Sequence, residues 1–213
     1  MMPVQAASRW KPASRRLAVA AIILTGVSLW SPDGMTADTE SPAAGPVITV
    51  NVRQDSVTKH DVIYAEAAYE THGEAVVSVI SAISGYAGLH SWITETELVY
   101  QSDSDRQEFH VEFQFPWPVG RKWSRIRVQR EADRRISWYQ LDGSLGRNEG
   151  HLALELREQH AQINYQAVID VGLPDAWTRT FKQKFVREFL MAVYDHAALA
   201  GEQTGLQLAS TSD

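Results

Sequence analysis

The seven histidines come first, because imidazole is both a common metal ligand and a common general base. They form no HExxH sequence and no pair at the four-residue spacing of a helix face: His60, His72, His90, His110, His151, His160 and His196. A zinc or iron site needs converging ligands, so no metal site is predicted. The chain also has no cysteine, no GxSxG sequence and no glycine-rich phosphate loop. We therefore assign no catalytic residue and no cofactor.

Three tyrosines are better candidates for polar contacts with a bound molecule. Tyr69, Tyr139 and Tyr165 each share a predicted strand face with apolar neighbours. Their hydroxyl groups could therefore contact the polar end of a ligand. The alternative is that each hydroxyl bonds a backbone carbonyl, as a buried tyrosine more often does.

The clearest apolar pattern lies in residues 106–115. Phe109, Val111, Phe113 and Phe115 occupy every second position, with polar residues between them. This two-residue period predicts a strand with one apolar face. Trp117 follows between two prolines, and we expect it on a loop at the rim of whatever this face encloses. The alternative is that Trp117 belongs to a packed turn.

The period changes after Pro174. Large apolar residues then recur every four positions: Trp177, Phe181, Phe185, Phe189 and Val193. This pattern predicts one amphipathic helix of about 25 residues. Phe181, Phe185 and Phe189 are expected to face the apolar strand residues. The rings would either wall a cavity or fill a solid core, and the pattern fits both.

Between these segments the chain alternates strands with turn-forming sequences. A strand beginning at Asp61 precedes two short helices, in GEAVVSVISAI and YAGLHSWI. Six strands follow, at about 93–101, 106–115, 121–131, 134–141, 149–157 and 160–171. No parallel crossover is implied, which excludes a Rossmann fold. The predicted class is α+β, with a curved antiparallel sheet of about seven strands, two short helices and a long C-terminal helix.

The N-terminus is typical of an exported protein. Basic residues precede an uncharged apolar run at 17–30, so residues 1–37 are predicted to be a signal peptide, with an uncleaved membrane anchor as the alternative. We expect a periplasmic location. Residues 38–59 are predicted to be a linker with an accessory strand in VITVNVRQ, 60–200 the folded domain, and 201–213 a disordered tail.

With the elements in this order, the chain resembles the superfamily of START lipid-transfer domains, polyketide cyclases, coenzyme-Q-binding proteins and the birch-pollen allergen. The resemblance rests on GEAVVSVISAISGYAGLHSWI, RRISWYQLDGSLGRNEGHLAL and INYQAVIDVGLPDAW, and covers about residues 61–200. It implies a helix-grip fold with a ligand cavity between the sheet and the last helix. The chain has GYAGLHSWI where many members carry an acidic DY pair, so the resemblance assigns no subfamily.

These observations predict a protein that binds, and transports, a hydrophobic small molecule such as a lipid, isoprenoid or quinone. A transient membrane contact would accompany transport, and the sequence carries no signal for an oligomeric state. The net charge of -6 argues against a nucleic-acid partner. Two alternatives stay open. One is a cyclase or dehydratase that uses the same cavity; the other is a solidly packed interaction module with Trp123, Arg125 and Arg127 on its surface.

Overall fold

The computed structural model describes residues 45–70, 73–103, 105–131, 134–157 and 160–210, without the side chains of 202–210. All of them belong to one compact unit within residues 40–213. The predicted signal peptide, 1–37, and the first part of the predicted linker, 38–44, lie outside the described residues.

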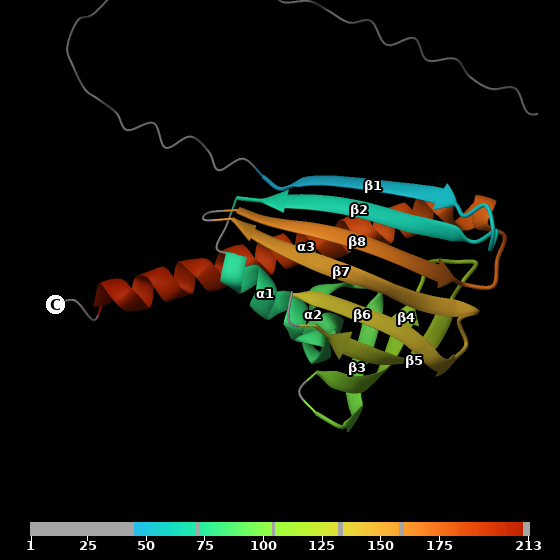
Figure 1. Cartoon of the computed structure of the whole chain (residues 1–213), viewed down its shortest axis with the longest axis horizontal. Coiled ribbons are helices and arrows are strands. Elements are labelled where there is room, and N and C mark those ends of the chain that lie inside the picture. Colours follow the sequence, from blue (N-terminus) through green and yellow to red (C-terminus); the bar gives the residue numbers. More distant parts are fainter. Residues whose placement is uncertain (1–44, 71–72, 104, 132–133, 158–159, 211–213) are drawn as a thin grey trace, which may run out of the picture. The chain divides into compact units, whose positions relative to one another are not determined.

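Eight antiparallel strands form one sheet in the order β1-β2-β8-β7-β6-β5-β4-β3 (Figure 1). Their bounds are β1 Val47–Gln54, β2 Asp61–Tyr69, β3 Ile93–Gln101, β4 Arg106–Gln114, β5 Arg121–Arg130, β6 Arg135–Gly143, β7 Arg147–Arg157 and β8 His160–Asp170. The sheet has eight strands rather than about seven, because VITVNVRQ forms β1 and pairs with β2 along its whole length. The accessory strand is therefore part of the main sheet.

The helices are α1 Gly73–Ser81, a 3-10 turn η1 Ile83–Gly85, α2 Tyr86–Leu89 and α3 Asp175–Ser210. One expectation is wrong: the segment predicted to be a disordered tail, 201–213, continues α3 as far as Ser210. The polar glycine-containing sequence suggested an end near Ala200. The segment contains Gly201 and Gly205, but each helical glycine costs only about 1 kcal/mol and does not by itself end a helix. Residues 211–213 lie outside the described residues.

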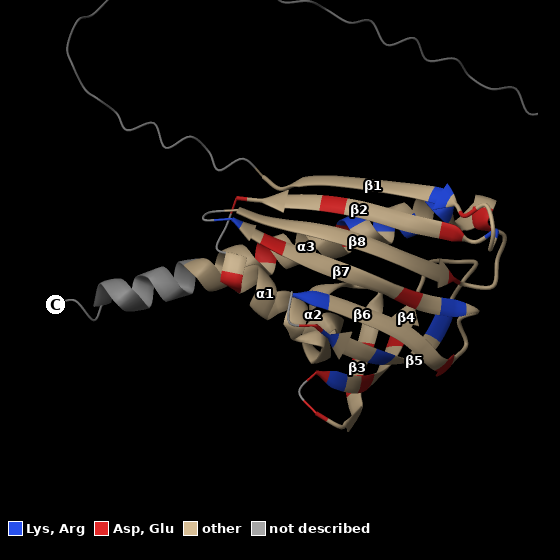
Figure 2. Cartoon of the chain, viewed as in Figure 1, with Lys and Arg blue, Asp and Glu red and all other residues tan. Residues whose placement is uncertain are grey.

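The two faces of the sheet differ as the two-residue period predicts. On β4 the inward side chains of Phe109, Val111 and Phe113 are buried. On the outer face Glu108 accepts hydrogen bonds from Arg125 and Arg127, which hold the pKa of its carboxyl below the ordinary value. Acidic and basic residues are interspersed over the described domain in Figure 2. The helix α3 covers the apolar face, since the rings of Phe113 on β4 and Phe185 on α3 lie 6.4 Å apart.

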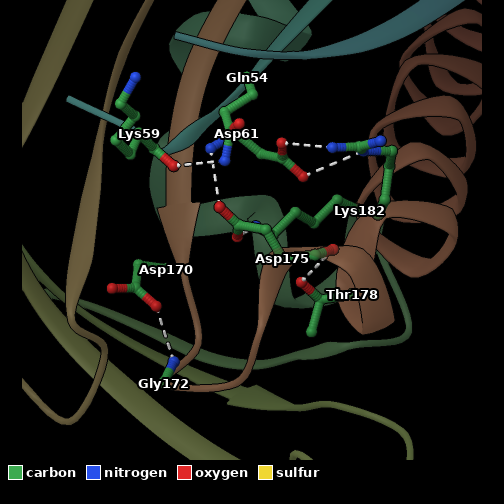
Figure 3. Close-up of polar contacts among 9 residues, drawn as sticks. Gln54, Lys59, Asp61, Asp170, Gly172, Asp175, Thr178 and Lys182 are labelled. Atoms are coloured by element: carbon green, nitrogen blue, oxygen red, sulfur yellow. Dashed lines mark hydrogen bonds and ion pairs between the residues drawn. The ribbon is translucent and has the colours of Figure 1, made fainter. Parts of the chain in front are cut away.

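A polar anchor, defined as Asp61, Asp175, Arg179 and Lys182, fastens the start of α3 to the start of β2. Figure 3 shows Asp61, Asp175 and Lys182 of this anchor. Arg179 makes a two-pronged contact with Asp61, with nitrogen–oxygen distances of 2.9 and 3.2 Å. The Asp61 backbone N–H donates to Asp175, and the buried Lys182 ammonium lies 2.5 Å from the same carboxylate. Burial alone would raise the pKa of Asp175, but these hydrogen bonds outweigh it and hold the pKa below 3.8.

Beyond this anchor, α3 lies closely against one half of the sheet. It contacts β1 and β2 as well as α1 and α2. The inner face of β2 carries the buried small residues Ala65 and Ala67, which let the helix backbone approach. The Tyr69 hydroxyl donates to the Leu190 carbonyl at 2.6 Å and ties the middle of the helix to β2. The other half of the sheet, β3 to β7, curves away and encloses the remaining space.

Candidate ligand-binding cavity

A cavity lies between the inner face of strands β3 to β8, the short helices and α3. Its volume is about 110 Å³. That is several times the roughly 10–15 Å³ that one water requires. Its lining is Ile80, Ile83, Tyr86, Ile93, Val111, Phe113, Ile126, Val128, Ile136, Trp138, Asn148, Leu152, Tyr165, Ile169, Phe185, Val186 and Phe189.

An aromatic cluster closes this cavity on one side. We define it as Trp92, Phe113, Phe115, Phe181 and Phe185. Phe113 stacks on Phe115 with ring centroids 5.2 Å apart, and Phe181 meets Phe115 edge-on at 5.4 Å. Trp92 stacks on Phe185 at 5.8 Å. Such offset and edge-on pairs stabilise packing beyond simple area burial. These rings therefore interlock, while the hollow beside them is lined mainly by branched aliphatic residues.

The cavity has a small polar region around Trp138. The indole Nε1–H of Trp138 donates to Asn148 Oδ1 at 3.1 Å, and the Trp138 ring lies 5.7 Å from that of Tyr165. The Tyr86 hydroxyl donates to the Ile80 carbonyl at 2.6 Å. Asn148 and Tyr165 are 7% and 8% exposed. Apolar side chains therefore form most of the wall, and polar atoms meet it at a few defined points.

The lining contains no Asp, Glu, His, Lys or Arg. Its titratable groups are the phenols of Tyr86 and Tyr165. Burial raises the pKa of each above the ordinary value of 10.0, so both stay neutral in the range where cells work. A charged ligand group inside the cavity would find no counter-ion among these residues.

His90 lies beside the aromatic cluster rather than in the cavity wall. Its ring is 4.7 Å from that of Phe185, and its Nδ1 accepts the Trp92 backbone N–H at 3.0 Å. Its Nε2 has no hydrogen-bond partner in the described part of the chain and lies 3.8 Å from Glu188 Oε2. Burial lowers the pKa of the imidazole below 6.5, although Glu188 opposes that shift. Burial therefore favours the neutral imidazole.

The residues proposed from sequence fall into three groups. Half of them line the cavity: Val111, Phe113, Tyr165, Phe185 and Phe189. Phe115 and Phe181 belong to the aromatic cluster. Phe109 and Tyr69 are buried in the core, outside the cavity lining, and the Tyr69 hydroxyl is bonded to α3. Only part of the aromatic set therefore surrounds space.

The placement of Tyr139 in the cavity is wrong. Tyr139 is 43% exposed, and its hydroxyl accepts a hydrogen bond from Arg127 on the outer face. Its neighbour Leu141 is also exposed, so the apolar residue two positions away indicated the wrong face. The inward residues of β6 are Ile136 and Trp138.

Trp117 lies on the loop between β4 and β5 and is 92% exposed. A packed turn is therefore excluded for this side chain. The loop directly follows Phe115 of the aromatic cluster. Its role at an entrance stays a prediction.

Sequence reasoning missed Asn148, a polar residue of the cavity wall. Asn148 was assigned to a turn, because GRN looks like turn chemistry, but β7 already begins at Arg147. Counting back in twos from the buried Leu152 would have placed Asn148 on the inner face. Trp138 could have been found from Ile136 in the same way.

Two further searches cover the described residues. No helix among them is long and apolar enough to cross a membrane. No group of three or more His, Asp or Glu side chains in the same ranges is arranged to hold a metal ion.

Comparison with solved structures finds proteins of the same architecture. Human STARD10 matches with a TM-score of 0.61 and 13% identity, over 78% of this chain and 75% of that one. A STAR-related lipid transfer protein from Xanthomonas axonopodis matches with a TM-score of 0.59 and 17% identity, over 70% and 93%. The fold is that of the START proteins. Helix-grip architecture, predicted from the order of elements, is confirmed.

The START fold also occurs in enzymes. The aromatase/cyclase Zhui from Streptomyces sp. R1128 matches with a TM-score of 0.52 and 15% identity, over 67% of this chain and 93% of that one. At such identities the likeness concerns the fold alone. No family sequence model matches the chain, and comparison with curated protein sequences finds no match.

Proposed function

We propose that the protein binds a hydrophobic small molecule in the cavity between the sheet and α3, and carries it as a non-catalytic transport protein. The observation that carries this proposal is the apolar hollow itself, which a solidly packed interaction module would lack. Ligand sites are typically concave, mostly apolar and furnished with few polar groups. The lipid-transfer proteins among the structural matches agree with this assignment.

Binding is favoured over catalysis by the chemistry of the lining. A cyclase or dehydratase needs a group that accepts or donates a proton near neutral pH. The titratable lining residues are two tyrosines whose pKa values burial raises further. The cavity is therefore better suited to holding a molecule than to changing it.

An environment-sensitive neutral dye, 1-aminoanthracene, would test the proposal. Ile136 lies in the cavity wall on β6, and Leu141 lies on the exposed outer face of the same strand. Ile136→Phe should fill space and weaken dye binding at least about 10-fold, because a benzyl group competes for the volume that the dye needs. Leu141→Phe is the matched control and should bind like the unchanged protein.

Native mass spectrometry of gently purified full-length chain supplies the second test. We expect added mass that disappears in Ile136→Phe and persists in Leu141→Phe. A chain that carries no added mass and also ignores the dye would contradict the proposal. Export to the periplasm is a separate part of it, tested by whether a periplasmic fraction contains chain shortened by residues 1–37.

A further inference from the structure

The polar region of the cavity contains hydrogen-bond donors that the described protein does not use. An indole N–H can only donate, so its bond to Asn148 fixes the orientation of the amide, with Oδ1 toward Trp138. Asn148 Nδ2 therefore presents its two N–H groups elsewhere. No described residue accepts a hydrogen bond from Nδ2, and none pairs with the Tyr165 hydroxyl.

Asn148 and Tyr165 are 7% and 8% exposed, and both residues line the cavity. Their free donor atoms are not sealed off, since His90 Nε2 is the one side-chain atom of the described residues that is both fully buried and unpaired. Polar groups inside folded proteins are nearly always paired, so donors that open onto a cavity suit a partner within it. The Tyr86 hydroxyl donates to the Ile80 carbonyl, and no hydrogen bond joins its oxygen to Asn148 or Tyr165.

The two donors lie on either side of Trp138. Trp138 pairs with Gly150 across β6 and β7, while Asn148 lies two residues before Gly150 and Tyr165 pairs with Leu152 two residues after it. Asn148 and Tyr165 therefore present their donors at two different positions of the cavity wall. An oxygen atom suits either position, because an amide N–H and a phenol O–H both donate to it.

Charge restricts the ligand further. The lining provides no Lys, Arg or His to pair with a carboxylate or a phosphate, and no acid to pair with an amine. Burying an unpaired charge is among the most unfavourable changes in a protein interior. A free fatty acid or a phosphate headgroup is therefore a poor occupant of the cavity.

We propose that the ligand is a neutral molecule bearing a carbonyl or hydroxyl oxygen, such as a ketone, quinone or alcohol. Asn148 Nδ2 donates to that oxygen, and the Tyr165 hydroxyl provides a second contact. This inference rests on the proposed function, because it names the class of molecule that the same cavity takes.

Three probes with one ring system separate the contributions: naphthalene, 2-acetonaphthone and 2-naphthoate. Binding to the full-length chain is measured by titration calorimetry and by the NMR signal of the Trp138 indole N–H, assigned with Trp138→Phe. The unchanged protein should bind the ketone about 3- to 10-fold more tightly than the hydrocarbon, the range that one net hydrogen bond provides. The carboxylate should bind at least about 10-fold more weakly than the ketone.

Variants then locate the preference. Asn148→Leu should remove most of the ketone's advantage while naphthalene binding is retained. Tyr165→Phe should reduce the advantage too, and it leaves every hydrogen bond of the described fold intact. Tyr139→Phe, the same change on the outer face, is the control and should alter nothing.

The outcomes separate the two proposals. If naphthalene and the ketone bind equally well in the unchanged protein and in both cavity variants, the inference about the oxygen is overturned and the carrier function stands. The inference is also overturned if the carboxylate binds as tightly as the ketone. If none of the probes binds, the proposed function itself is overturned.

Discussion

The space beneath α3 is filled differently in two neighbouring regions. In the aromatic cluster, Phe115 lies against Phe113, Phe181, Phe185 and Trp92 at centroid distances of 5.2 to 6.3 Å. In the adjacent region Ile136 and other branched side chains surround a hollow. The sequence pattern fitted both a cavity wall and a solid core, and the structure contains both: Phe113, Phe185 and Phe189 line the cavity, while Phe115 and Phe181 lie in the packed cluster. Side-chain size at facing positions, rather than aromatic content, therefore decides where space remains.

The largest effect on stability is expected from removing a ring from the aromatic cluster. Phe115 is 2% exposed and has four aromatic neighbours. Phe115→Ala should lower the free energy of unfolding by about 3–5 kcal/mol, since a cavity forms in packed surroundings. Urea denaturation followed by circular dichroism measures the change. A loss below about 1 kcal/mol would mean that the cluster is loosely packed.

A matched pair of isoleucines compares the packed core with the cavity wall, using the same truncation at both positions. Ile163 on β8 is fully buried and lies outside the cavity lining, whereas Ile136 already borders empty space. Ile163→Ala should fall near the upper end of the roughly 2–5 kcal/mol range for such truncations, and Ile136→Ala near the lower end. Equal losses in the same denaturation experiment would argue against a real difference in packing.

The pH dependence of stability tests His90 at the edge of the cluster. Its pKa is below 6.5 when folded, so the unfolded chain binds the proton first as the pH falls. The free energy of unfolding should therefore decrease as the pH is lowered from about 7.5 through 6.5. His90→Gln should flatten this dependence. Carboxyls with lowered pKa values, among them Glu108 and Asp175, affect stability only near and below their ordinary values of 4.5 and 3.8.

An increase in stability as the pH falls through that interval would contradict a lowered pKa for His90. A pKa that folding raises would make the free energy of unfolding rise as the pH is lowered. Glu188 is the charged group that faces the imidazole at 3.8 Å. Glu188→Gln therefore serves as a second variant. It should make the decrease slightly steeper, because the carboxylate favours the protonated ring.

The smallest effect on stability is expected at Trp117. Its side chain is 92% exposed, so Trp117→Ala should change the free energy of unfolding by no more than about 0.5 kcal/mol. If the loop borders the entrance, the dissociation rate of bound 1-aminoanthracene should rise several-fold in a stopped-flow measurement. Unchanged kinetics would remove Trp117 from the entrance.

Local periodicity was enough to predict most of the elements. Strand β3 occupies the residues expected, 93–101, and β4 and β5 differ from the prediction by one residue each at their ends. Phe185 and Phe189 were correctly placed on the face of α3 that covers the sheet. These predictions succeed because a strand repeats every two residues and a helix every 3.6, so burial on one face leaves a direct trace in the sequence.

The errors arose where a local pattern had two interpretations. Tyr139 was placed inside because Leu141 shares its face, and Asn148 was placed in a turn because of its residue type. In both cases the parity of the strand decides the direction of the side chain, and parity depends on where pairing with the next strand begins. For Asn148 that pairing starts at Arg147, opposite Asp170.

The sequence by itself therefore determined the α+β class, the order of the elements and the apolar faces of β4 and α3. Only the tertiary structure decided that Phe115 and Phe181 interlock while a hollow remains beside Ile136 and Trp138. Whether facing side chains meet depends on how closely α3 approaches each strand. The polar anchor and the small residues of β2 set that distance. These contacts join segments that are far apart along the chain, so they produce no periodic pattern in the sequence.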